Sequence, residues 1–410
     1  MDKQRNTAWL VVVVALLCLC GCGAASSEGQ RRAVAPATPS PRITTLPPTA
    51  AATMTAVPTA TATAVPTATS EPVVRLIAVG DMLPHDTLNL RAYDTSTEEY
   101  DYTKFMADLA PIFAAADIRF CNQEAASSPT LPVSGYPRFN APAAFPRDLN
   151  RQGCNLITLA NNHLADHGQA GIDGTLALWD TLPTLAVAGV SRSAEEQAAP
   201  RTFSINGIRF AFVAVSEASN VPPPAPFSLN LLEAPSVDAQ LAAARAAADV
   251  VIVAAHWGYE DAATPSDGQR WWAQRLADAG ADLIVGSGPH VLQPVEWLTT
   301  PRGQSVVWYS LGNLLSTQYE FDQLIGGIAS MEIRLVDGQP QIDDLAFYPT
   351  YMHYDWPPDG ELLGRDNLHL FPLLAGDEAL QHAHQRRAAE VWGEVEQRLN
   401  QEATVTLRSP

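Results

Sequence analysis

The sequence predicts an α/β fold preceded by a disordered N-terminal tether. Three observations support this: short apolar runs alternate with helical patterns from residue 73 onward, the runs are rich in β-branched residues, and an Ala/Thr/Pro-rich stretch with few core-forming residues precedes them. Alternating strands and helices are typical of an α/β domain. Nearly continuous apolarity along a run indicates a strand that is buried on both faces.

The clear apolar runs lie at 75–79, 118–121, 156–159, 210–215, 250–255, 283–285 and 306–309. Helical patterns occupy 237–247 and 269–279, and Gly280 follows the second as a residue that commonly ends helices. Apolar residues at three-and-four spacing predict a packing helix within 377–400. No linker-like break divides 73–410, so we expect one domain with a core at 74–350 and a C-terminal extension.

The first 72 residues carry targeting and tether patterns. Basic residues precede a short apolar run at 9–19, and the sequence Leu-Cys-Gly-Cys, which ends at Cys22, follows that run. The run is too short to span a bilayer, so 1–21 is predicted to be a signal peptide and Cys22 the lipidated residue. An ordinary signal peptide and an uncleaved anchor are the alternatives. Residues 22–72 are predicted to be a disordered linker. With a lipid on Cys22, the domain is predicted to lie on the extracellular face of the cell membrane.

The charge balance restricts the partners. The chain has 25 basic and 44 acidic residues, for a net charge of -19. Nucleic acid is therefore excluded as a partner, because neutralising phosphates requires a basic face. A polyanionic or phosphoester substrate would need a metal ion or local arginines to reverse this field.

Two cysteines, Cys121 and Cys154, lie in the folded part. Cys121 is expected at the carboxyl end of one strand, and Cys154 precedes the start of the next. If these strands are parallel and adjacent, the two residues lie roughly 10–15 Å apart along the sheet. A disulfide needs Cα atoms within about 7 Å, so we expect two free thiols.

Short polar motifs follow five of the predicted strands. They are Gly-Asp-Met at 80–82, Asn-Gln-Glu at 122–124, Asn-Asn-His at 161–163, His-Trp-Gly at 256–258 and Gly-Ser-Gly-Pro-His at 286–290. Ligands of open α/β sheets bind beyond the carboxyl ends of the strands, so we expect these motifs to converge on one crevice. Their carboxylate, amide and imidazole donors suit a divalent metal such as Mn, Fe or Zn. Taken singly, each motif is also explained as a helix cap or a turn.

Together with LANNHLADHGQAGIDGTL (159–176), GADLIVGSGPHVLQPVEW (280–297) and YSLGN (309–313), these motifs resemble the CapA-type capsule synthesis family, also called the poly-γ-glutamate capsule biosynthesis family. The resemblance covers residues 74–350. It implies a metallophosphatase-like β-sandwich flanked by helices, as in the calcineurin-like metallophosphoesterases, with a metal centre at the strand ends.

The resemblance also assigns roles by matching motif. It implies two metal positions that share Glu124, the first with Asp81 and His290 and the second with Asn162 and His256. His163 would be the general acid, a role that an imidazole suits near neutral pH. Asp166 would orient that imidazole, although by itself it is also explained as a solvated turn carboxylate.

Two departures from the family pattern concern the metal centre. The histidine expected shortly after Asp81 is absent or displaced to His85. Gly288 replaces a histidine that would serve the second ion, and glycine offers no side-chain donor. We therefore predict one tightly bound divalent ion, and a gain at the second position in Gly288→His.

These features predict a surface-anchored protein of capsule or exopolymer synthesis, with metal-assisted hydrolysis as its candidate chemistry. Whether catalysis occurs is left open. One alternative is a non-catalytic lipoprotein that binds a polymer or a partner within a capsule-synthesis membrane complex. The other is a general phosphoesterase unrelated to capsule.

Overall fold

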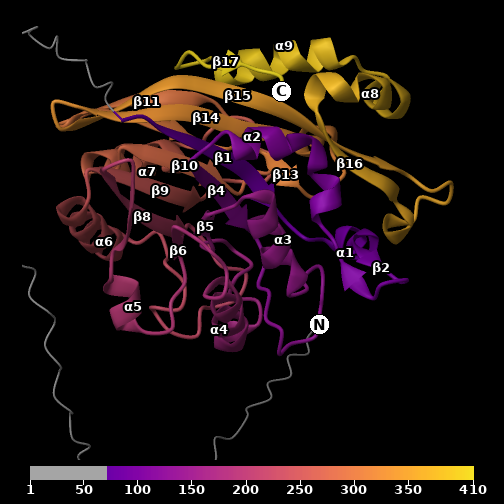
Figure 1. Ribbon diagram of the computed structural model, residues 1–410, viewed down its shortest axis with the longest axis horizontal. Coiled ribbons are helices and arrows are strands. Elements are labelled where there is room, and N and C mark those ends of the chain that lie inside the picture. Colours follow the sequence, from indigo (N-terminus) through magenta and orange to yellow (C-terminus); the bar gives the residue numbers. More distant parts are fainter. Residues whose placement is uncertain (1–71) are drawn as a thin grey trace, which may run out of the picture. The chain divides into compact units, whose positions relative to one another are not determined.

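Two β-sheets pack face to face in the computed structural model, which describes residues 72–410 (Figure 1). The predicted signal peptide, Cys22 and all but the last residue of the predicted linker lie outside the described residues. In the part of the chain that is described, no helix has the length and apolarity needed to cross a bilayer.

The first sheet contains the predicted strands that carry Asp81 and Glu124. Its strands are β1 (Val74–Met82), β4 (Ile118–Gln123), β5 (Leu156–Thr158), β6 (Ala186–Ala188), β13 (Asn313–Leu315), β14 (Ile325–Val336), β15 (Gln339–Asp355), β16 (Asp366–Pro372) and β17 (Thr406–Leu407). The order is β16-β15-β14-β1-β4-β5-β6, with β13 paired to β1 and β17 to β15. β1, β4, β5 and β6 run parallel, so their carboxyl ends meet at one edge.

The second sheet carries His256 and the strand that leads to His290. Its strands are β7 (Arg201–Ile205), β8 (Ile208–Ser216), β9 (Val250–His256), β10 (Leu283–Ser287), β11 (Val295–Thr300) and β12 (Gly303–Trp308). The order is β11-β12-β10-β9-β8-β7, and β8, β9, β10 and β12 are parallel. A small hairpin of β2 (Tyr93–Asp94) and β3 (Glu99–Tyr100) stands apart. The seven apolar runs predicted as strands correspond to β1, β4, β5, β8, β9, β10 and β12.

The side-chain alternation of β8 explains why its sheet is buried on both faces. Phe210 and Phe212 point into the core between the two sheets, where the rings of Phe212 and Phe120 lie 6.0 Å apart. Ala211 and Val213 point the other way and pack with apolar residues of two helices. A strand with period-two alternation and apolar residues on both faces needs a layer on each side, which gives the sandwich flanked by helices.

The helices are α1 (Asp86–Ala92), α2 (Ala110–Ala114), α3 (Ala144–Gln152), α4 (Gly168–Trp179), α5 (Ala194–Ala198), α6 (Ala234–Ala247), α7 (Asp267–Asp278), α8 (Asp377–His384) and α9 (Ala388–Leu399). α6 and α7 match the predicted helices at 237–247 and 269–279 and cover the outer face of the second sheet. A capping box at Ser266 begins α7, and Gly280, with φ of 113°, follows it. α8 and α9 lie along β15 (Figure 1).

The region 377–400 contains two helices rather than one. Gln385 adopts a left-handed conformation that ends α8, and the backbone N–H of Ala388 at the start of α9 bonds the carboxylate of Asp377. The apolar spacing of Val391 and Val395 is that of a packed face, as predicted, but it belongs to α9 alone. The pattern correctly located the buried face and missed the break, because no Gly or Pro marks it.

The prediction of free thiols is wrong: Cys121 and Cys154 form a disulfide, with Cα atoms 5.8 Å apart. The prediction assumed that the chain before β5 extends in line with that strand. Instead Gly153, with φ of 127°, ends α3, and the backbone N–H of Cys154 bonds the carbonyl of Leu149. This turn brings Cys154 back over Cys121, which lies within β4 rather than at its end.

Candidate metal centre

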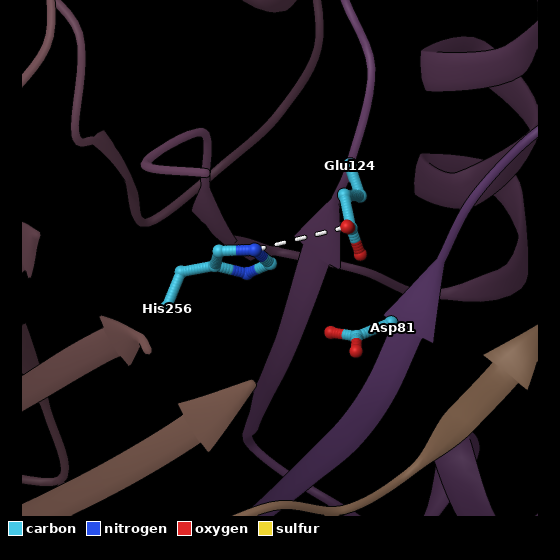
Figure 2. A group of neighbouring side chains, drawn as sticks. All are labelled: Asp81, Glu124 and His256. Atoms are coloured by element: carbon cyan, nitrogen blue, oxygen red, sulfur yellow. Dashed lines mark ion pairs between the residues drawn. The ribbon is translucent and has the colours of Figure 1, made fainter. Parts of the chain in front are cut away.

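Four motifs meet where the parallel strands of the two sheets end. Asp81 and Asn122 are paired residues of β1 and β4, and Glu124 directly follows β4. In the second sheet, His256 ends β9 and pairs with Ser287, the last residue of β10. The ligand atoms of Asp81, Glu124 and His256 all lie within 4.8 Å of one another, and the three side chains converge in Figure 2. The predicted convergence of these motifs at the strand ends is therefore observed.

Glu124 is the centre of this cluster. It is fully buried, and neither carboxylate oxygen has a hydrogen-bond partner. Its Oε1 lies 3.7 Å from Nε2 of His256 and 3.6 Å from Nε2 of His290. A buried carboxylate without partners is strongly disfavoured unless a cation neutralises it.

Neighbouring polar groups orient the candidate ligands. The Nδ1 of His256 lies 2.9 Å from the hydroxyl of Ser287. The Nδ1 of His290 lies 3.1 Å from the oxygens of both Asp81 and Asn313, so it donates and leaves Nε2 directed at Glu124. Such outer hydrogen bonds set the ring orientation of metal-ligating histidines.

The charges of the cluster are strongly coupled. Burial opposes the ionisation of Asp81, yet the hydrogen bond and charge of His290 hold its pKa below the usual range. Burial, reinforced by the charge of Asp81, raises the pKa of Glu124 well above its usual value. Burial lowers the pKa of His256 to about 4, whereas for His290 the charges of Glu124 and Asp81 outweigh burial and raise its pKa to about 10.

These residues fit a divalent ion. The side-chain oxygen of Asn162, a predicted ligand, is also buried without a hydrogen-bond partner. The two carboxylates and two imidazoles that lie together form a donor set that suits Mn, Fe or Zn. Asp81, Glu124 and His256 would hold one ion together. The resemblance had assigned His256 to the second metal position, whereas the structure places it also with Asp81 of the first. An ion held there would act as a Lewis acid toward water and a substrate oxygen.

His163 and Asp166 form a buried dyad after β5. The Nδ1 of His163 lies 2.8 Å from Oδ2 of Asp166, which also accepts the backbone N–H of Phe139 at 2.9 Å. Asp166 is fully buried, which excludes the interpretation as a solvated turn carboxylate. Because the carboxylate holds Nδ1, a general acid at this position would act through Nε2, which lies 3.3 Å from the side-chain nitrogen of Asn220.

Gly288 adopts φ of 106° beside the candidate ligands His256 and His290. A Cβ at this position would lie 2.9 Å from the carbonyl oxygen of Trp257 and 3.3 Å from Nε2 of His256. The backbone therefore disfavours any side chain here. The expected gain of a second ion in Gly288→His is not supported by this geometry, because the new side chain would crowd both the backbone of Trp257 and the imidazole of His256.

Several residues of the site were not predicted. Asn122, Ser287 and Asn313 lie inside the quoted motifs, but their bonds to ligands depend on the pairing of strands far apart in sequence. Phe139 packs edge-on against His163 at 4.6 Å between centroids and against His85 at 5.5 Å. No sequence signal marks Phe139, because it comes from the long connection between β4 and α3.

His85 lies beside the crevice but outside the group of Asp81, Glu124 and His256. Its Nδ1 accepts the backbone N–H of Thr317 at 3.4 Å. Burial and the nearby charges of His290 and Arg365 lower the pKa of His85 to about 3. The structure thus places His85 as a neutral neighbour of the site.

The comparison with known families decides the relationship. The sequence profile described as "Bacterial capsule synthesis protein PGA_cap" matches residues 75–318. The chain belongs to this family. The match confirms the resemblance inferred from the motifs and spans all predicted ligands of the crevice.

Curated relatives of this PGA_cap protein have related descriptions. The PGA biosynthesis protein CapA of Bacillus subtilis is 31% identical over 172 residues, covering 40% of this chain and 43% of the relative. The capsule biosynthesis protein CapA of Bacillus anthracis is 31% identical over 175 residues, covering 40% and 41%. A probable polyglutamine synthesis accessory protein of Mycobacterium tuberculosis is 28% identical over 249 residues, covering 56% and 58%. The chain thus spans less than two thirds of the length of these relatives.

Solved structures show a weaker likeness. A hypothetical protein from Thermus thermophilus has a TM-score of 0.42 at 16% identity, covering 67% of this chain and 99% of that one. The calcineurin-like phosphoesterase YfkN from Bacillus subtilis has a TM-score of 0.38 at 14% identity, covering 78% and 100%.

Proposed function

We propose that this PGA_cap protein takes part in the synthesis of a polyglutamate-like capsule or exopolymer, and that its crevice performs metal-assisted hydrolysis. The observation that carries the chemical part is the buried Glu124: neither carboxylate oxygen has a hydrogen-bond partner, and Oε1 lies near Nε2 of both His256 and His290. The His163–Asp166 dyad nearby supplies a candidate proton donor. The names of the curated relatives support the pathway.

The proposed location is the extracellular face of the cell membrane, with a lipid on Cys22. In that position the domain would meet a polymer as it leaves the cell, within a capsule-synthesis membrane complex. The substrate would be phosphoester- or γ-glutamyl-linked. A metal ion would offset the net charge of -19, which otherwise repels such anionic groups.

The test is metal analysis of residues 72–410 combined with hydrolysis assays on phosphoester and γ-glutamyl substrates. Glu124→Gln should remove both metal and turnover. The matched control is Glu378→Gln, the same substitution on the exposed first turn of α8, which should preserve both. Turnover that is unchanged in Glu124→Gln would refute the proposed chemistry. Turnover of phosphoesters alone would favour a general phosphoesterase if deletion of the gene also left the amount of polymer unchanged.

A non-catalytic accessory role is the second candidate. Gly288 favours it, because this position offers no donor to a second ion and its backbone disfavours a side chain. Metal binding that depends on Glu124, without turnover of either substrate class but with retained binding of the polymer, would support this role.

A further inference from the structure

One connection contacts both sheets at the strand ends. Residues 217–233 join β8 to α6, and we call them the β8–α6 connection. The backbone N–H of Glu217 donates to the carbonyl of the candidate ligand His256 at 2.8 Å, and the Glu217 carboxylate accepts the backbone N–H two residues after His256 at 2.7 Å. The backbone N–H of Asn220 donates to the carbonyl of Asn162 at 2.9 Å. The connection therefore contacts both the end of β9 and the motif that follows β5.

Prolines restrict the conformation of this connection. They occupy four of the five positions from 222 to 226. Each proline ring fixes φ and reduces the freedom that the chain loses on folding. The backbone N–H of Ala225 donates to the hydroxyl of Ser228, and the backbone N–H of Ser228 donates to the carbonyl of Ala225, both at 3.0 Å. Asn220 is therefore presented by a segment that is organised before any ligand binds.

The side chain of Asn220 lies against the imidazole of His163. Its Nδ2 is 3.3 Å from Nδ1 and 3.3 Å from Nε2 of that ring. An atom in the plane of the ring at equal distance from both nitrogens would overlap the ring carbons, so the amide lies over the face of the ring. Ring nitrogens accept hydrogen bonds in the ring plane, whereas an N–H over the face makes a weaker contact with the π system. Asn220 therefore leaves the in-plane direction at Nε2 free.

Three groups hold this ring. Oδ2 of Asp166 lies 2.8 Å from Nδ1, and the ring of Phe139 stands nearly perpendicular to the imidazole at 4.6 Å between centroids. Asp166 and Phe139 are buried, so the exposed Asn220 is the solvent-facing member of the three. A ring that is held by three groups points Nε2 in one direction. That direction matters, because a misplacement of about 1 Å can cost about a hundredfold in rate.

We propose that Asn220 is a positioning residue: its amide over the face of the His163 ring keeps Nε2 in the orientation from which it donates a proton to the leaving oxygen of a phosphoester. In that step water adds to phosphorus, the bond from phosphorus to the leaving oxygen breaks, and this oxygen takes the proton from Nε2. The ring recovers a proton that the attacking water releases. The inference rests on the proposed function, because the orientation of Nε2 affects turnover only where the site hydrolyses its ligand. An amide that merely secures the connection would affect stability and leave proton transfer unchanged.

A double-mutant cycle on the full-length protein with Mn²⁺ tests this role. Asn220→Ala should lower kcat for phenyl phosphate by roughly ten- to a hundredfold, with KM nearly unchanged. The loss should be smaller for para-nitrophenyl phosphate, whose leaving oxygen needs less help from an acid. In the His163→Ala background, Asn220→Ala should cause no further loss, because the two residues act as a unit. The matched control is Ser219→Ala, which removes the bond from the Ser219 hydroxyl to the carbonyl of Val221 at 2.6 Å in the same connection and should preserve kcat.

Nitrogen NMR of isotope-labelled histidine rings gives a readout that needs no turnover. The signals of His163 are identified by their absence in His163→Ala. They should be sharp in the zinc-loaded parent and broadened in Asn220→Ala, because the ring is then freer to rotate. Ser219→Ala should keep the signals of the parent.

The outcomes separate the two proposals. If Asn220→Ala lowers kcat equally with and without His163, the positioning role is overturned and the proposed function stands. The same holds if the His163 signals stay sharp and unshifted in Asn220→Ala, or if that variant loses stability but keeps kcat. Turnover of γ-glutamyl substrates alone would also overturn the positioning role, because the proposed step ends at a phosphoester oxygen. A parent protein that turns over neither phosphoester nor γ-glutamyl substrates refutes the proposed chemistry itself.

Discussion

Removal of the Cys121–Cys154 disulfide should destabilise the domain without disturbing the metal centre. The bridge closes a loop with a sequence separation of 33, for which the loss of loop-closure entropy corresponds to about 4 kcal/mol. In Cys121→Ala with Cys154→Ala, each buried sulfur also leaves a small cavity that costs about 1 kcal/mol. The free energy of unfolding should therefore fall by about 6 kcal/mol. With an unfolding entropy of about 2.1 cal/mol/K per residue, the melting temperature should fall by roughly 8 °C.

Calorimetry on the variant and the parent measures this shift, and metal content is the control, because both cysteines lie in the apolar core and outside the group of Asp81, Glu124 and His256. Thiol counting on denatured, unreduced parent protein should find no free sulfhydryl in the domain. Two free thiols would refute the pairing, and a melting temperature within about 2 °C of the parent would refute the loop-entropy argument.

Further predictions concern the crevice and the anchor. Gly288→Ala should lower the free energy of unfolding by about 1–3 kcal/mol and weaken metal binding, because the φ of 106° and a Cβ contact at 2.9 Å oppose a side chain. Chemical denaturation and metal titration measure these effects. No change in either would contradict the backbone argument. Metal affinity should rise with pH up to about 10, because Glu124 and His290 must both lose protons before an ion binds. Burial raises the pKa of Glu124, and the surrounding carboxylates raise the pKa of His290 to about 10 against the effect of burial. Titration in buffers of different ionisation enthalpy should detect the released protons. If the protein is a hydrolase, His163→Ala should lower turnover by about two to four orders of magnitude while circular dichroism stays unchanged, and full activity would exclude it as the general acid. Cys22→Ser should move the protein from the membrane to the soluble fraction, and unchanged retention would argue against lipidation.

The arrangement of the crevice was largely predictable, because the carboxyl ends of parallel strands must meet. Asp81, Glu124 and His256 lie at or just beyond the carboxyl ends of strands that the apolar runs predicted, so their convergence follows from topology. The orientation of each side chain was not predictable in this way. It depends on Asn313 and Ser287, which reach the ligands only once distant strands are paired.

The wrong predictions, of one C-terminal helix and of two free thiols, both arise at turns. One turn has no Gly or Pro to mark it, and the other directs the chain in an unexpected direction. The break at Gln385 has no such marker, and the turn at Gly153 reverses the chain instead of extending it. The burial of Asp166 likewise depends on the connection that carries Phe139, whose path no periodic pattern describes. Sequence patterns specify helices and strands well, whereas the path of a long connection is determined by the surfaces against which it packs.

A metal ion held by the unpartnered oxygens of Glu124 would also link the persistence of the folded protein to the metal content of its surroundings. An ion that binds only the native state stabilises it by about 2.7 kcal/mol when its free concentration is a hundred times its dissociation constant. That amount lowers the unfolded population about a hundredfold, and with it the share of molecules exposed to proteases. Where the ion is scarce, the buried carboxylate has no compensating charge and the protein should be degraded faster. Scarcity of a trace metal would thus reduce the amount of this protein before it limits any reaction in the crevice.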